Sequence, residues 1–413
     1  MFSLQSYMGH HLTPGNYGRA FALVGFYGIV TRPARSFGRQ VAWHMSRRSL
    51  EETLQPSLAD SVLLRLTLWL FAAGIVIGII STVSSGTLAI FFHTSRSEIL
   101  ATAWGAPFLL GIQTLKGALE GERRFVIWSA INILVPALYV IGVVSLIDSF
   151  KVLGVLLALS LGTVIGFFVC IVVLWRSLYR ALKAPMKVPW RSDLPFLTNG
   201  IVATLTNGVF LSADVIAVQH YFAHQISGQY AIVAAIGNVL FSATTGIVNV
   251  MFPYVADRQH KGLSSRPIVL TVIAIFALGS IFGAVFLQVF GSEALRVFAG
   301  VRYIGGATYL GWYAIGMGIL SWSTALLHAQ TARNSFKLLW ASVPALATRL
   351  LLLLLFHNSP KQIVLITDGL ALSFAITLFV MFLQDEKAML SKTRSRAVEF
   401  QVNSSTIDQA GPK

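Results

Sequence analysis

Three arginines at helical spacing lie inside an apolar stretch of the chain and fit a phosphate group. Arg32, Arg35 and Arg39 are three and four residues apart, so a helix presents them on one face. An arginine inside a membrane costs at least about 2.5 kcal/mol at mid-helix, so it normally faces a cavity or a partner. Guanidinium groups bind phosphate oxygens through paired hydrogen bonds. We expect a phosphate-binding cavity lined by these arginines and by Lys116. The alternatives are extension of Arg39 and Arg35 to the cytoplasmic interface and, for Lys116, a local pair with Glu120.

A second set of polar side chains lies on later apolar stretches. Asp214 either binds a coupling H+ or Na+ or pairs with a cavity arginine, and both roles stay open. Asn199 and Asn207 on the same stretch either add polar lining or bond between helices. Arg349 and Asp368 lie on the last two stretches, each about 10 Å below the outer end of a helical hairpin. We expect these two to form a structural salt bridge, since neither charge is stable alone at that depth. The alternative is that one of them faces the cavity and titrates.

The sequence shows no residue pattern that is typical of an enzyme's active site. We recognise no nucleophile, base and acid at plausible spacing, no Cys/His cluster with metal-ligand spacing and no glycine-rich phosphate loop. The one cysteine, Cys170, cannot form an intrachain disulfide and is typical of a small apolar core residue. The sequence therefore favours a protein that is not an enzyme and that uses no metal or cofactor.

Long apolar stretches carry all of these residues. The 413 residues are 55% hydrophobic and 11% charged, and the mean hydropathy is +0.71. Lipid cannot hydrogen-bond an exposed backbone, so a stretch of about 20 apolar residues crosses as a helix. We predict an all-α polytopic membrane protein of about eleven spans, the first of them kinked at Pro33. The expected spans are residues 18–43, 61–83, 97–119, 125–147, 152–175, 195–220, 229–255, 267–290, 305–329, 336–356 and 362–383.

Basic residues concentrate on alternate connections between the spans, for example Arg123 and Arg124, or Arg258 and Arg266. By the positive-inside rule these connections are cytoplasmic, which places the C-terminus inside. An odd number of spans then places the N-terminus outside. The formal net charge of +15 is explained by this topology, and no basic, aromatic domain outside the membrane indicates nucleic acid. We expect a multi-pass protein of the inner (cytoplasmic) membrane.

The chain contains a weak internal repeat, as transporters often do. When Gly18 is set on Gly228, Arg48 falls on Arg258 at the basic inner end of each helix. The expected parts are an N-terminal helical bundle (1–175), a basic cytoplasmic linker (176–193), a C-terminal six-helix bundle (194–385) and a polar cytoplasmic tail (386–413).

The two halves differ at their beginnings. The second half has a span before its repeat glycine, at residues 195–220, whereas only 17 residues precede Gly18. We therefore expect that the first helix of the first half is missing, through a late start assignment or a true truncation.

Several motifs occur in the order and spacing of one transporter family. They are Leu12-Thr13-Pro14-Gly15-Asn16-Tyr17-Gly18, Leu119-Glu120-Gly121-Glu122-Arg123-Arg124-Phe125, Leu194-Pro195-Phe196, Ser212-Ala213-Asp214-Val215-Ile216-Ala217-Val218, Gly228-Gln229-Tyr230, Met251-Phe252-Pro253-Tyr254-Val255-Ala256-Asp257, and Phe290-Gly291-Ser292-Glu293 before Tyr303. From residue 4 to about 385 the chain resembles the polysaccharide-transporter branch of the multidrug/oligosaccharidyl-lipid/polysaccharide flippase superfamily. The resemblance implies two six-helix bundles around a central cavity and alternating access, with the helix missing here as a departure.

We therefore expect a flippase for lipid-linked oligosaccharide or polysaccharide precursors of the cell envelope, such as O-antigen, lipopolysaccharide or exopolysaccharide. Its substrate would carry a polyprenyl phosphate or pyrophosphate, and its partners would be membrane lipids, glycosyltransferases and a polysaccharide polymerase. One alternative is a cation-coupled multidrug antiporter of the same superfamily, which favours acidic cavity residues. A second is a membrane glycan polymerase or ligase, which needs a large outer loop. A third is a structural membrane subunit.

Overall fold

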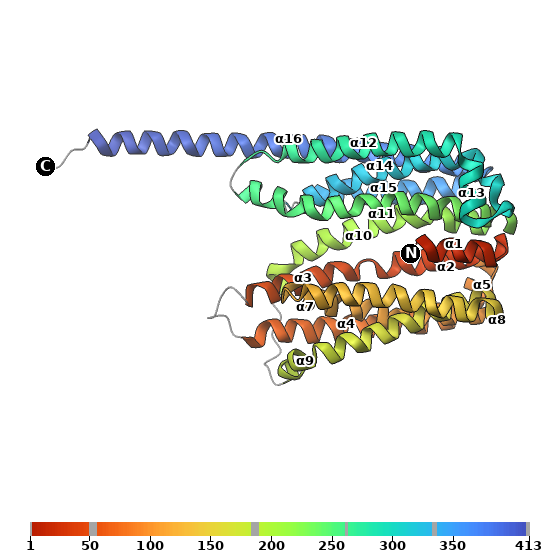
Figure 1. The fold of residues 1–413 in the computed structure, drawn as a ribbon. Coiled ribbons are helices and arrows are strands. Elements are labelled where there is room, and N and C mark those ends of the chain that lie inside the picture. The colour runs from red at the N-terminus through yellow and green to blue at the C-terminus, as the bar shows by residue number, and fades with distance from the viewer. Residues whose placement is uncertain (1, 49–55, 183–189, 261–262, 333–336, 410–413) are drawn as a thin grey trace.

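The computed structural model describes residues 2–48, 56–182, 190–260, 263–332 and 337–409, and all regular structure within them is helical (Figure 1). The first half contains α1 (Phe2–His11), α2 (Pro14–Thr31), α3 (Ala34–Arg48), α4 (Pro56–Val83), α5 (Ser85–Phe92), α6 (Arg96–Ala103), α7 (Ala106–Gly121), α8 (Phe125–Val173) and α9 (Trp175–Leu182). The second half contains α10 (Trp190–Tyr221), α11 (His224–His260), α12 (Arg266–Val289), α13 (Gly291–Ala299), η1 (Val301–Gly306), α14 (Ala307–Ala332), α15 (Lys337–Leu355) and α16 (Pro360–Gln409).

The described helices supply the predicted spans. Eight helices are long and apolar enough to cross a membrane. One of them, α8, is 49 residues long and leaves the helical conformation at Lys151, so it supplies two spans. The predicted spans 18–43 and 97–119 are each built from two shorter helices, α2 with α3 and α6 with α7. The prediction of an all-α polytopic membrane protein is confirmed.

Local sequence explains where the broken spans divide. Thr13 caps α2 by accepting a hydrogen bond from the Asn16 backbone N–H, and Pro14 occupies the first turn. Pro33, between α2 and α3, lacks an N–H and interrupts the helical hydrogen bonds. The break separates an apolar outer piece from an inner piece that carries most of the arginines.

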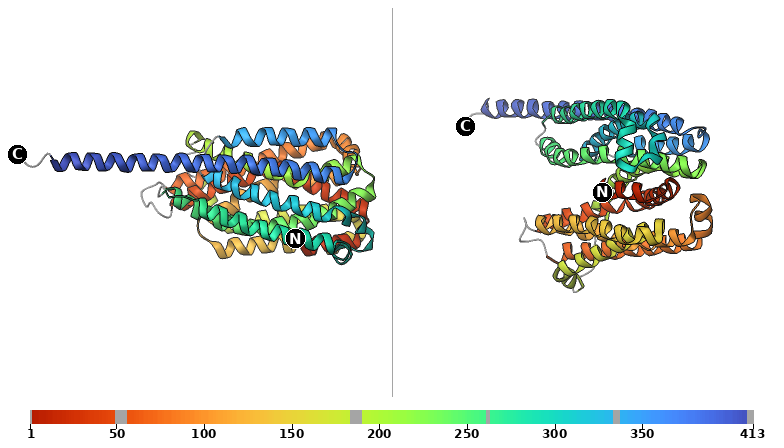
Figure 2. Two further views of the ribbon diagram at one scale, coloured as in Figure 1. Left: turned by 90° about the horizontal axis from the view of Figure 1, so that it is seen from above. Right: turned by 45° about the vertical axis from the view of Figure 1, so that its right-hand side comes forward.

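The helices form two groups that lie along one common direction (Figures 1 and 2). We call the end with α9 and the basic connections the inner end, and the end with α5 and α13 the outer end. The broken first span lies between the groups, because α2 packs mainly on α10 and α11 of the second half. Its inner piece, α3, packs instead on α7 and α4 of the first half. One span thus contributes to both groups.

The two repeat glycines lie against each other at the outer end. A Cβ atom on Gly18 would lie 3.0 Å from the Gly228 backbone nitrogen, and a Cβ atom on Gly228 would overlap the Pro14 carbonyl oxygen. Helices α2 and α11 therefore begin in backbone contact, which only glycine allows here. This contact brings together the two positions that the sequence repeat sets as equivalent.

Candidate functional site

The predicted arginine face lies at the break between α2 and α3. The half-buried Arg32 side chain donates a hydrogen bond of 3.3 Å from Nη1 to the Asn207 carbonyl of α10. Gly208 leaves room for it, since a Cβ atom there would lie 3.0 Å from Arg32 Cδ. Arg32 therefore helps to join the two halves as well as adding positive charge.

Arg35 and Arg39 have no such partner. Neither guanidinium makes a hydrogen bond or ion pair with any part of the chain that the structure describes. The Arg35 side chain is exposed and the Arg39 side chain is half-buried. Helix α3, which carries both, packs on α7 and α4 of the first half and also on α10 of the second half. We call the place of these two side chains the arginine recess. Unpaired guanidiniums that solvent can reach are available to bind an anion.

Lys116 and His328 extend the same charged region. Lys116 Nζ donates a hydrogen bond of 2.9 Å to Asn132 Oδ1, and it lies within electrostatic range of Arg35. Arg39 lies within electrostatic range of both Glu120 on α7 and His328 on α14. The sequence did not indicate Asn132 or His328 as site residues. Because His328 belongs to α14, the charged region lies close to the second half.

The two predicted asparagines of α10 differ in their surroundings. Asn199 is fully buried, so it does not line an open surface. Asn207 is half-buried; its Oδ1 accepts a hydrogen bond of 3.1 Å from Thr324 of α14, and its backbone carbonyl binds Arg32. Asn207 therefore connects Arg32 of the first half to Thr324 of α14.

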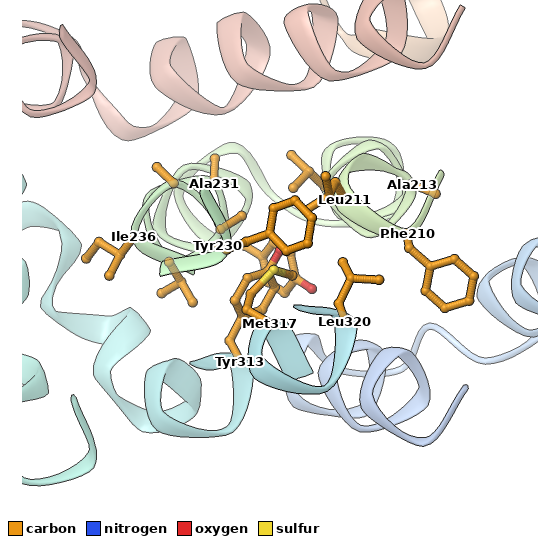
Figure 3. Packing of buried hydrophobic residues seen from close by; sticks show 14 of the residues in the cluster. Phe210, Leu211, Ala213, Tyr230, Ala231, Ile236, Tyr313, Met317 and Leu320 are labelled. Atoms are coloured by element: carbon orange, nitrogen blue, oxygen red, sulfur yellow. The ribbon is translucent and has the colours of Figure 1, made fainter. Parts of the chain in front are cut away.

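Asp214 lies in a fully buried polar cluster of the second half. Its Oδ2 accepts hydrogen bonds from the Tyr230 hydroxyl (2.8 Å) and the Tyr313 hydroxyl (3.0 Å), and its Oδ1 lies 3.5 Å from Arg349 Nη2. All four side chains are at most 1% exposed. Figure 3 shows Tyr230 and Tyr313 lying together between the helices that carry them, and their ring centroids are 5.7 Å apart. The two tyrosines were missed by sequence reasoning, although Tyr230 belongs to one of the motifs.

The predicted salt bridge between Arg349 and Asp368 is wrong. Arg349 Nη2 points to α10, where it contacts Asp214 and donates a hydrogen bond of 3.1 Å to the Phe210 carbonyl. Its guanidinium carbon also lies 4.6 Å from the centre of the Phe210 ring. Asp368 instead lies against Gly316 of α14, within electrostatic range of both Arg349 and Asp214. Of the two roles left open for Asp214, the structure supports pairing with an arginine, but in a dry core.

The halves are held together at the outer end. Hydrogen bonds run from Ser6 to the Phe298 carbonyl (2.7 Å) and from Tyr303 to the Leu12 carbonyl (3.1 Å). Another group joins the end of α5 to the end of α10. It comprises Gln219 to the Phe92 carbonyl (2.9 Å), His220 to the Phe91 carbonyl (3.0 Å) and His93 to the His220 carbonyl (3.2 Å). The arginine recess lies on the other side of these contacts, toward the inner end.

The chain is similar to known proteins in structure but not in sequence. No family model and no curated protein matches the chain. An inward-facing multidrug resistance MATE family transporter of the MOP superfamily has a TM-score of 0.72 and 13% identity, over 94% of this chain and 94% of that one. Lipid II flippase MurJ in an inward closed conformation has a TM-score of 0.68 and 12% identity, over 97% and 90%. A MOP superfamily transporter from Pyrococcus furiosus has a TM-score of 0.58 and 14% identity, over 94% and 93%.

The similar structures include a MATE family transporter of the MOP superfamily in an inward-facing and in an outward-facing conformation. The outward-facing one has a TM-score of 0.63 and 15% identity, over 94% of this chain and 92% of that one. The sequence resemblance to this superfamily is supported at the level of fold, while its polysaccharide branch stays a prediction. The chain has the fold of the MOP superfamily transporters.

Proposed function

We propose that this protein is a flippase that carries a lipid-linked oligosaccharide or polysaccharide precursor across the cytoplasmic membrane by alternating access. The observation that carries the proposal is the pair of guanidiniums, Arg35 and Arg39, that solvent can reach and that have no hydrogen bond or ion pair within the described residues. An unpaired arginine at membrane depth is costly, so a binding partner that arrives with the substrate accounts for it. A phosphate or pyrophosphate next to a lipid tail supplies that partner.

Lys116 and Arg32 have supporting roles in this proposal. Lys116 adds charge to the recess, and Arg32 holds the recess against α10. The sugar would lie in the water-accessible space between the halves, while the lipid tail stays in the bilayer. The C-terminus then lies in the cytoplasm and the outer contacts face the opposite side. No bond in the substrate needs to break.

The test is a flipping assay in proteoliposomes. The full chain is reconstituted with a fluorescent polyprenyl-diphosphate oligosaccharide, and a membrane-impermeant quencher reports the leaflet in which the label lies. We expect the double variant Arg35→Gln/Arg39→Gln to flip at least about tenfold more slowly, because charged hydrogen bonds are lost. Double replacement by Lys should restore flipping only in part, since Lys lacks the paired donors.

Arg19→Gln is the matched control. It removes one positive charge, where the double variant removes two, at the outer end of α2, where Arg19 bonds to Asn16 and lies 4.0 Å from Glu98. This variant should flip at the wild-type rate. Equal rates for wild type and the double variant, at equal amounts of folded protein, would exclude a phosphate site at Arg35 and Arg39.

A second candidate, a cation-coupled multidrug antiporter, is favoured by Asp368. This half-buried carboxylate lies inside the second half, and it forms no hydrogen bond or ion pair within the described ranges. Proton-driven uptake of a cationic dye into vesicles distinguishes the two. Dye transport that Asp368→Asn abolishes, without transport of the lipid-linked sugar, would favour the antiporter.

A further inference from the structure

Helix α9 connects the two halves and lies across the common direction of the spans. It follows the inner end of α8 and precedes α10 in the chain. Figure 1 shows it nearly end-on beside the long helices. A short helix in this orientation, at the end with the basic connections, lies along the membrane surface rather than through it.

One face of α9 is firmly attached to the first half. Ser177 Oγ donates a hydrogen bond of 3.1 Å to Glu122 Oε1, and Arg180 Nε lies 3.5 Å from Asp60 Oδ2 of α4. Ser177 and Ala181 are buried, and Asp60 is only 1% exposed. The helix is therefore held in one rotational position, so its other face has a fixed direction.

The opposite face is apolar and exposed. Trp175, Tyr179 and Leu182, spaced by four and three residues, are 60%, 49% and 69% exposed. Val172, in the last turn of α8 before this helix, is 75% exposed. The exposed Arg176 side chain adjoins the face and has no hydrogen bond or ion pair to the residues that the structure describes. Aromatic side chains beside a free arginine are typical of the boundary between acyl chains and headgroups.

We propose that this face of α9 binds an anionic phospholipid of the cytoplasmic leaflet. Trp175, Tyr179 and Leu182 insert beside the acyl chains, and Arg176 binds the phosphate of the headgroup. The apolar surface favours a lipid over a free anion, and the arginine favours an anionic headgroup over a zwitterionic one. This site is separate from the recess at Arg35, and it does not depend on what the protein transports.

Native mass spectrometry of the full-length protein tests the proposal. The delipidated protein is offered equal amounts of phosphatidylglycerol and phosphatidylcholine, and the lipids retained are counted. We expect the wild type to prefer phosphatidylglycerol, and Arg176→Gln to weaken that preference about fivefold. Adding Trp175→Ala should reduce retention of phosphatidylglycerol further. Arg176→Lys should retain most of the preference, because it keeps the charge.

Trp340→Ala is the matched control. Trp340 is 84% exposed near the inner end of α15, where the nearby Lys337 is paired with Asp385 at 2.5 Å. Its loss should leave the preference unchanged. Equal retention of the two lipids by the wild type, or an unchanged preference in Arg176→Gln, would overturn the proposal. Displacement of the phospholipid by millimolar inorganic phosphate would also overturn it, since that marks an anion site without a lipid-binding surface.

Discussion

Replacement of Arg349 by Met should destabilise the protein, because Asp214 would stay buried without its counter-charge. Removing one partner of a buried ion pair costs about 3–5 kcal/mol. Two features of this site shift the value toward the lower end. Asp214 keeps the hydrogen bonds from Tyr230 and Tyr313, and the substitution removes Arg349 Nε and Nη1, which have no hydrogen-bond partner among the described residues. We therefore expect a loss of about 3 kcal/mol.

The assay is thermal unfolding of the purified protein in detergent. With an unfolding entropy of about 2.1 cal/mol/K per residue, a loss of this size lowers the Tm by roughly 3–4 °C. The double variant Arg349→Met/Asp214→Asn should return to within about 1 kcal/mol of the wild type, since neither charge remains. Arg266→Met, at the exposed start of α12, serves as the control without effect. A single variant as stable as the wild type would refute the reasoning, as would a double variant that is the sum of its singles.

Two other changes test the contacts between the halves, and a third tests the charged region around Arg35. Gly228→Ala should lower the Tm, because its Cβ would overlap the Pro14 carbonyl oxygen, whereas Gly246→Ala on the same helix has open space and should not; equal Tm values for both would contradict the backbone contact. Gln219→Leu should increase labelling of a cysteine introduced at the outer end, since the bond to the Phe92 carbonyl is lost; unchanged labelling would mean that this bond does not hold the outer end closed. Lys116→Met should weaken binding of a polyprenyl diphosphate without changing the Tm, and an unchanged affinity would remove Lys116 from the recess.

The length of apolar runs predicted the spans well, because each helix in lipid must satisfy its own backbone. The same pattern could not predict all breaks. The proline at 33 indicated one, and it separates α2 from α3. The break at residues 104–105, between α6 and α7, lies inside an apolar run, where periodicity carries no signal, and only Gly105 and Pro107 indicate it.

The surroundings of the candidate residues were predicted in part, while their role stays a prediction. Helical spacing placed Arg35 and Arg39 on one face, and the structure leaves both unpaired. The error at Arg349 has a clear physical origin. Counting residues along a hairpin gives the depth of a side chain, but it does not say which neighbouring helix the side chain faces. Helix α15 packs on α10 as well as on α16, so Asp214 at a similar depth was a competing partner.

The acceptors of the outer contacts have a consequence for how the protein tolerates mutation. The five hydrogen bonds described above that join the halves there end on backbone carbonyls, those of Leu12, Phe91, Phe92, His220 and Phe298. A carbonyl is present whatever the side chain, so most substitutions at Leu12, Phe91, Phe92 and Phe298 preserve the acceptor. These hydrogen bonds therefore depend on the side chains that donate them, which are Ser6, His93, Gln219, His220 and Tyr303. A substitution at an accepting position therefore acts through packing, since Leu12, Phe92 and Phe298 are buried, whereas a substitution at a donor removes a contact between the halves.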